Sequence, residues 1–262
     1  MKSISSRIHS PQRILTLLGF GTAVSLLGDA TLYTVLPNPI FAAQVGVSLG
    51  MVGILLAVNR AVRLVLNGPV GSLYDRLPRR GLLVASLFIG TFSNLLYALG
   101  SGFWPLFAGR VFWGIAWALL WIGGNAVVLD ISTEADRGRN SGRYQLWFMF
   151  GVAFSSFVGG VLTDLSGFRG AMWLTTGVIG AAALLWLFFF PETRQTGGEF
   201  QSEVQLNTSS PNTPWAFAIA AGLPVFVARF VCWGVLAATM ILWLENMVGG
   251  GIQVGGIIIP LA

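Results

Sequence analysis

The sequence predicts an all-α integral membrane protein, and three observations lead to this fold class. Of the 262 residues, 55% are hydrophobic and only 10% are charged, and the mean hydropathy is +0.75. Such a small number of charges could not cover the surface of a soluble domain of this size. The apolar residues gather into long runs, and a short charged sequence motif, called the charged phrase below, lies between two of these runs and recurs further along the chain.

Each apolar run is long enough to cross about 30 Å of hydrocarbon as a helix, which takes roughly 20 residues. Seven runs of this kind follow one another in the sequence: 14–36, 49–70, 82–101, 104–129, 144–163, 168–190 and 222–244. The sequence therefore predicts seven membrane-spanning helices.

Basic residues are distributed unevenly over the connections between these runs. The intervening connections hold only Arg169, whereas ten basic residues lie in the N-terminal arm and the alternate connections: Lys2, Arg7, Arg13, Arg76, Arg79, Arg80, Arg137, Arg139, Arg143 and Arg194. The positive-inside rule then places the N-terminus in the cytoplasm. The same distribution accounts for the isoelectric point near 10.1, so no nucleic-acid partner is expected.

The charged phrase GSLYDRLPRRG, residues 71–81, recurs as GVLTDLSGFRG, residues 160–170, with glycine, leucine, aspartate, arginine and glycine at the same spacing. Three predicted spans separate the two copies, which places them on opposite faces of the membrane. A loop motif repeated across the membrane after three helices predicts an inverted repeat of three plus three helices.

These residues resemble the major facilitator superfamily (MFS) of secondary transporters. The first copy is similar to the signature loop between the second and third helices of that family, and six of its residues match: Gly71, Leu73, Asp75, Arg76, Arg79 and Arg80. Pro78 stands where the family usually has glycine. Further matches are GRVFWGIAWA with Arg110 and Gly114, the loop EADRGRNSGR, and PETR at 191–194.

One family pattern is only half present. The fifth helix of proton-driven exporters in this superfamily carries a motif of glycines around a central glycine and proline. Here GVAFSSFVGG supplies Gly151, Gly159 and Gly160 but has Ser155 and Ser156 at the central positions. Close helix packing would account for these small residues equally well, so export and import both stay open.

The resemblance implies a twelve-helix protein in two six-helix halves. On this interpretation residues 1–190 form the N-terminal half and 191–214 a cytoplasmic linker. Residues 215–262 then begin the second half with a seventh helix and a partial eighth, and the missing C-terminal half is required for transport. The implied function is secondary active transport of a small organic solute by alternating access in the inner (plasma) membrane, coupled to protons. The alternative is a half-length membrane scaffold or a truncated transporter without transport activity.

Charged residues inside the spans are expensive in a bilayer and are candidates for function. They are Asp29, Arg60, Arg63, Arg110 and Arg229. Asp29 is the only acid in mid-span, which makes it the candidate carrier of a coupling proton, with Arg110 at a similar depth. The alternative is a permanent ion pair between Asp29 and Arg60.

The second span carries a polar stripe within an arc of roughly 100°, formed by Asn59, Arg60, Arg63 and Asn67. The stripe predicts either the wall of a substrate cavity that attracts an anionic group or a lock between helices. On the fourth span Trp113 and Trp117 could stack on a flat or cationic substrate, or they could pack between helices.

The resemblance also implies a conformational latch at the cytoplasmic ends of the helices. Its residues would be Gly71, Asp75, Arg76, Arg79, Arg80 and Asp130. The arginines also act as topology signals.

An enzyme is disfavoured, because no span holds a nucleophile beside a base, paired acids or histidines. The lone Cys232 and the single His9 predict no metal and no cofactor.

Overall fold

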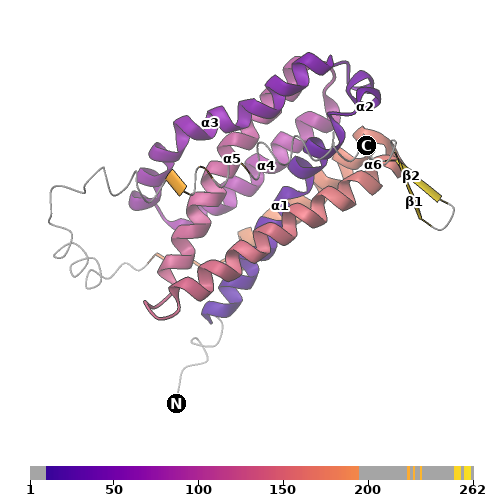
Figure 1. Cartoon of the computed structure of the whole chain (residues 1–262). Helices are drawn as coiled ribbons and strands as arrows, with labels where there is room; N and C mark the ends of the chain where they lie inside the picture. Colours follow the sequence, from indigo (N-terminus) through magenta and orange to yellow (C-terminus); the bar gives the residue numbers. More distant parts are fainter. Residues whose placement is uncertain are drawn as a thin grey trace. The chain divides into compact units, whose positions relative to one another are not determined.

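The computed structural model describes residues 10–194 and, beyond them, 223–224, 227, 231, 251–254 and 257–260. The chain divides into two compact units, Met1–Gln195 and Thr196–Ala262. The first unit holds the helices shown in Figure 1: α1 (Pro11–Val35), α2 (Pro39–Gln44), α3 (Leu49–Arg76), α4 (Arg79–Leu99), α5 (Phe103–Asp130) and α6 (Arg137–Phe189).

Five helices among the described residues are long and apolar enough to cross a membrane. Four of them, α1, α3, α4 and α5, coincide with the first four predicted spans. The fifth, α6, contains 53 residues, and at 1.5 Å per residue it would be roughly 80 Å long, far more than one bilayer requires.

A single glycine interrupts α6 and explains its apparent length. Gly167 has a φ of 71°, a left-handed conformation that glycine adopts without strain, and it is not helical. It separates two helical limbs, 137–166 and 168–189, which contain the fifth and sixth predicted spans almost entirely. We call these α6a and α6b.

Two helices organise the contacts of the first unit. α1 packs along α6, with Gly19 against Trp147 of α6a and Leu17 against Trp186 of α6b. α5 packs against both α3 and α4, and α4 also contacts α6. In chain order the spans are α1, α3, α4, α5, α6a and α6b. If the first three exchanged places with the last three in order, each of these helix pairs would fall on a pair that is also in contact. The pairings are thus compatible with an inverted repeat, which stays a prediction.

The two copies of the charged phrase break the helix at matching positions. α3 ends at Arg76 and α4 begins at Arg79, so the first break includes Pro78. Pro78 aligns with Gly167, the break in the second copy. The copies also belong to different clusters of buried residues: the cluster of Tyr74 includes Ile14 and Leu15 from the start of α1, and the cluster of Phe168 includes Val35 from its end. The copies therefore lie at opposite ends of the bundle, as expected.

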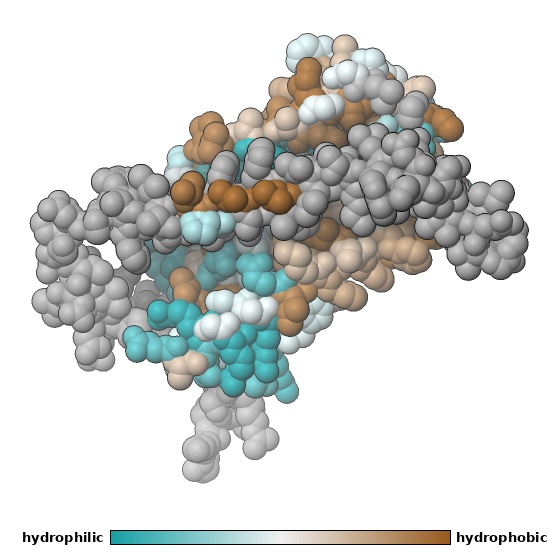
Figure 2. All heavy atoms as spheres, viewed as in Figure 1, coloured by the Kyte–Doolittle hydropathy of each residue, from teal (hydrophilic) through white to brown (hydrophobic). Residues whose placement is uncertain are grey.

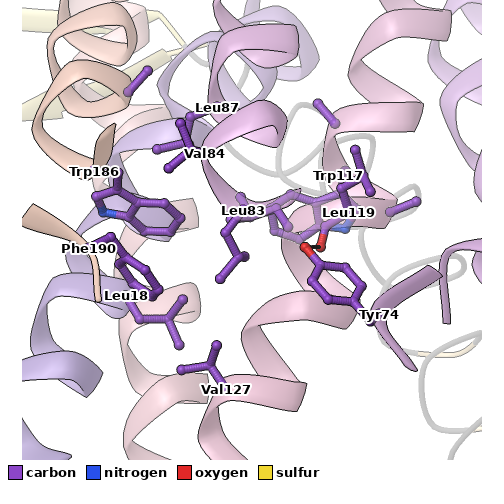
Figure 3. Packing of buried hydrophobic residues seen from close by; sticks show 14 of the residues in the cluster. Leu18, Tyr74, Leu83, Val84, Leu87, Trp117, Leu119, Val127, Trp186 and Phe190 are labelled. Atoms are coloured by element: carbon purple, nitrogen blue, oxygen red, sulfur yellow. Dashed lines mark hydrogen bonds between the residues drawn. The ribbon is translucent and has the colours of Figure 1, made fainter. Parts of the chain in front are cut away.

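Aromatic residues fill much of the larger cluster, as Figure 3 shows for Trp186 and Phe190 beside Leu18. The ring centroids of Trp186 and Phe190 are 4.8 Å apart. The Trp186 indole N–H donates to the Leu17 carbonyl at 3.3 Å, and the Tyr74 hydroxyl donates to the Leu119 carbonyl at 3.0 Å. The Trp186 indole N–H and the Tyr74 hydroxyl thus each have a hydrogen-bond acceptor, while the two rings pack in the core.

Small residues let α1 and α6a approach each other closely. Gly151, Ser155 and Gly159 are buried, and a methyl group added to Gly151 or Gly159 would overlap α1 at Ala23 or Thr31. By contrast, nothing lies within 4 Å of a Cβ built on Gly160. Helix packing therefore accounts for the buried small residues in the half-present exporter motif.

These two adjacent glycines give a matched test of that packing. We expect Gly159→Ala to lower the free energy of unfolding by about 1–3 kcal/mol, because the added methyl group overpacks the interface with α1. Gly160→Ala should be neutral or stabilise by up to about 1 kcal/mol, because alanine is the better helix former. Thermal unfolding in mild detergent measures both, and equal effects of the two substitutions would contradict the close approach.

In the second unit the structure differs from the prediction. The expected opening of an eighth helix is instead an antiparallel pair of short strands, β1 (Gly251–Val254) and β2 (Ile257–Pro260). β-branched valine and isoleucine favour strands. The seventh span, Arg229 and Cys232 within it, and the linker after Arg194 lie for the most part outside the described residues.

The opposite placement of the two phrase copies predicts their accessibility in cells. Single cysteines at the exposed positions Ser72 and Ser166, in a Cys232→Ser background, should react with an impermeant maleimide from opposite sides of the membrane. Labelling in intact cells and in everted vesicles distinguishes the sides. Reaction of both cysteines from one side would contradict the arrangement of spans.

Candidate functional site

The centre of the bundle holds an ion pair between Asp29 of α1 and Arg110 of α5. The Arg110 side chain is completely buried, and the Asp29 side chain is 15% exposed. Arg110 Nη1 donates to Asp29 Oδ1, and Arg110 Nε donates to the Leu55 carbonyl of α3 at 3.1 Å. A guanidinium withdrawn from water needs such partners, so this one arginine binds to two other helices at once.

An aromatic ring covers one side of the pair. The Tyr33 ring centroid lies 4.6 Å from Arg110 Cζ, a distance at which a cation is attracted to the ring. Arg60 Cζ lies 6.0 Å from the same centroid. The Tyr33 hydroxyl donates to the Leu56 carbonyl of α3 at 2.9 Å. Tyr33 thus stands in contact with both the buried arginine and the exposed one.

Buried polar atoms of four residues in this region, Asn59, Asn94, Tyr97 and Arg110, have no hydrogen-bond partner among the described residues. Two of these atoms belong to α3 and α5. They are Arg110 Nη2 and Asn59 Oδ1, and both are buried. One is a donor and the other an acceptor. Buried polar atoms are normally paired, so these two are available to water or to a bound solute.

The ion pair expected between Asp29 and Arg60 is not the one that forms. Arg60 is exposed on α3, whereas Arg110 faces the core and takes the carboxylate. Arg60 and Arg110 both lie at the depth of Asp29 in the membrane. Which of them pairs with Asp29 depends on how α3 and α5 are rotated about their helix axes. α5 approaches α3 closely because Gly114 has no side chain: a methyl group there would overlap Val62.

The polar stripe of α3 does not form one continuous wall in the structure. Asn59 is buried, Arg63 is half-buried, and Arg60 and Asn67 are exposed. Arg63 Cζ lies 5.8 Å from the ring centroid of Trp117, so this arginine meets the aromatic face of α5.

The tryptophans proposed for substrate stacking pack in the core. Trp113 and Trp117 are almost fully buried, with ring centroids 6.0 Å apart. Trp117 also stacks on Trp121 at 5.6 Å, and Trp121 on Tyr144 of α6a at 5.8 Å. This aromatic row joins α5 to α6a.

A second group of charges joins the helix ends near the first phrase copy. Arg79 Nε donates to Asp130 Oδ2 at 3.2 Å, and the Thr193 hydroxyl donates to the same oxygen at 3.3 Å. Arg79 also donates to the Tyr74 carbonyl. Arg79 and Asp130, two of the latch residues that the resemblance implies, are therefore in contact, and they connect α4 to α5.

The PETR segment completes this group, a role that the sequence analysis did not identify. The Glu192 carboxylate accepts the backbone N–H groups of Arg79 at 3.0 Å and Arg80 at 3.1 Å, the first two residues of α4. A carboxylate there satisfies otherwise unpaired donors and complements the helix dipole. Arg194 donates to the carbonyls of Asp75 and Arg76 at the end of α3. In the sequence, the signal for this role was an acid and a base two residues apart, Glu192 and Arg194.

The remaining latch candidates take a lesser part. The Asp75 carboxylate is exposed and makes no hydrogen bond or ion pair within residues 10–194. Gly71 borders open space, and Arg76 contributes its carbonyl. Arg80 donates to the Leu187 carbonyl of α6b at 2.6 Å.

Comparison with known proteins identifies the family. The sequence profile described as Major Facilitator Superfamily matches residues 18–261. The chain belongs to this superfamily. It is therefore a membrane protein of a transporter family, as the spans and the charged phrases predict.

Several relatives are named for drug resistance or drug efflux. The tetracycline resistance protein, class C, of Escherichia coli is 30% identical over 223 residues, which are 80% of this chain and 55% of the relative. A chloramphenicol efflux pump of Mycobacterium tuberculosis is 34% identical over 155 residues, 58% of this chain and 37% of the pump. The chain thus spans about half the length of these relatives or less.

A solved MFS structure has the same fold. The human organic anion transporter MFSD10 (TETRAN) superposes with a TM-score of 0.59 at 19% identity, over 71% of this chain and 49% of that one. At this identity the likeness shows the fold alone.

The role of Glu192 at the start of α4 can be tested directly. Glu192→Ala removes the acceptor for two backbone N–H groups and should destabilise the first unit by about 1 kcal/mol, a typical cost for losing a helix cap. Glu134→Ala removes an exposed acid from the nearby loop and should have little effect. Thermal unfolding in detergent compares the two, and a silent Glu192→Ala would show that the capping contacts add no stability.

Proposed function

We propose that the chain is part of a proton-coupled exporter of small organic solutes that works by alternating access. Its membership of the MFS and the named functions of its relatives support transport and favour export. Proton coupling is proposed from one observation: Asp29 forms an ion pair with Arg110, and the Arg110 side chain is completely buried.

Coupling follows from the cost of leaving Arg110 without its carboxylate. A proton on Asp29 removes the negative charge that compensates a guanidinium shielded from water. Arg110 would then be held by the Leu55 carbonyl and the Tyr33 ring, both outside α5. The lowest free energy would shift to an arrangement that offers the arginine another anion or access to water. In this way the charge state of one carboxyl group selects between helix arrangements.

The group of charges at the helix ends serves as the second element of this mechanism. Arg79, Asp130 and Glu192 hold the ends of α4, α5 and the PETR segment together. We assign to them the role of a latch that keeps these ends in register while the opposite end of the bundle opens. The N-terminus and this latch lie on the cytoplasmic side in the proposal, because the basic residues gather there.

Two relatives indicate which solutes to test first. They are named for tetracycline resistance and chloramphenicol efflux. Arg60, Arg63 and Asn67 on α3 would contribute to binding an anionic group of the solute. Everted vesicles from cells that express the chain with the C-terminal half of the class C relative provide the assay. Saturable accumulation of either drug supports export, whereas its absence with every partner half favours a scaffold without transport.

The proton-carrying role predicts a specific defect for Asp29→Asn. Accumulation driven by an imposed pH gradient should be lost, while exchange of labelled for unlabelled solute should persist, because the amide resembles the protonated acid but cannot release a proton. Everted vesicles measure both activities. Coupling that is unaffected in Asp29→Asn would exclude Asp29 as the proton carrier.

Stability measurements on the same variants identify the ion-pair partner. Asp29→Asn leaves Arg110 unpaired, which should cost about 3–5 kcal/mol. Adding Arg110→Gln should restore much of the lost stability, whereas adding Arg60→Gln should not, because Arg60 is exposed. Thermal unfolding decides, and rescue by Arg60→Gln instead would contradict the observed pairing.

A further inference from the structure

An open groove runs between the start of α1 and the start of α6a. Its volume is about 590 Å³, within the range of about 300–1,000 Å³ that is typical of sites for small molecules. Seven side chains line it: Gln12, Leu15, Thr16, Arg143, Leu146, Trp147 and Phe150. None of them belongs to the ion pair or to the charges at the helix ends.

The lining changes from polar to apolar along the groove. Gln12 lies in the first turn of α1 and Arg143 in the second turn of α6a. Further into the span follow Leu146, which is 70% exposed, and Phe150, which is 57% exposed. Figure 2 shows hydrophilic side chains gathered at the end of the molecule where α6 begins in Figure 1. The groove therefore crosses from this hydrophilic end into the apolar part of the helices.

The side chains at the polar end are available to a ligand. Arg143 is exposed and has no hydrogen bond or ion pair within residues 10–194. By contrast, Arg139, one turn earlier, is paired with Asp136 at 2.7 Å. Trp147 forms a fixed floor, because its ring packs where Gly19 of α1 has no side chain. A tryptophan and an arginine at this level are typical of the boundary between headgroups and acyl chains.

We propose that this groove binds one anionic phospholipid of the surrounding bilayer. The headgroup phosphate accepts hydrogen bonds from Arg143 and from the Gln12 amide, and the start of an acyl chain lies over Leu146 and Phe150. Basic pockets between helices at the membrane surface recognise anionic headgroups in this way. The order of polar and apolar residues matches an amphiphile, and the positive charge selects an anionic one. The proposal depends on the chain being a membrane protein and not on its transport activity.

Native mass spectrometry of the purified, delipidated chain in mild detergent tests this site. Added phosphatidylglycerol should bind more tightly than phosphatidylcholine, and Arg143→Gln should weaken its binding roughly fivefold, the effect of one basic residue at an anionic surface. Arg137→Gln removes the same charge from the same helix end but outside the groove, and it should change binding less than about twofold. Arg143→Lys, which keeps the charge, should retain most of the affinity.

A second pair of variants tests the acyl portion. Phe150→Ser should weaken both phospholipids, whereas Phe157→Ser, at an exposed position of α6a outside the groove, should weaken neither. Unchanged unfolding temperatures without lipid show that each variant is folded. Equal binding of the two phospholipids, equal losses in Arg143→Gln and Arg137→Gln, or displacement of the lipid by millimolar inorganic phosphate would overturn the proposal.

Discussion

One buried cation sets the arrangement of the central helices. The Arg110 side chain is completely buried, and it is held by the Asp29 carboxylate of α1, the Leu55 carbonyl of α3 and the Tyr33 ring. Removing α1 or α5 would leave a charge uncompensated in a medium of low dielectric constant, which is among the most costly defects in a folded protein. Removing α3 would leave the Arg110 Nε–H without its acceptor. The positions of α1, α3 and α5 therefore depend on one another.

The close approach of the helices makes this arrangement possible. Apolar side chains gain little from leaving lipid for a helix interface, so association depends on packing and on polar contacts. Gly151 and Gly159 bring α6a against α1, and Gly114 brings α5 against α3. The tryptophans of α5 then fill the space toward α6a as a stacked row. Residues that look like candidates for substrate contact thereby serve the core.

At the end of the bundle that carries the charged phrase, hydrogen bonds to backbone groups add to the packing. Glu192 accepts from the first residues of α4, and Arg194 donates to the last carbonyls of α3. Each charge meets the helix end of opposite partial charge. Because the same segment also reaches Asp130 through Thr193, three consecutive residues, Glu192, Thr193 and Arg194, link the ends of three helices.

The sequence by itself determined the class, the positions of the first four spans and the interruption between the fifth and sixth predicted spans, because hydropathy and helix-breaking residues act locally. It also placed Asp29, Arg60 and Arg110 at one depth, since depth follows from counting residues along a helix. Only the tertiary structure decided that Arg110 is the partner of Asp29, that Trp113 and Trp117 are core residues, and that Gly159 but not Gly160 contacts α1. Each of these depends on how a helix is rotated about its axis, and that rotation is set by the surfaces of its neighbours. In chains with apolar residues on every face, the pattern of one helix does not reveal it.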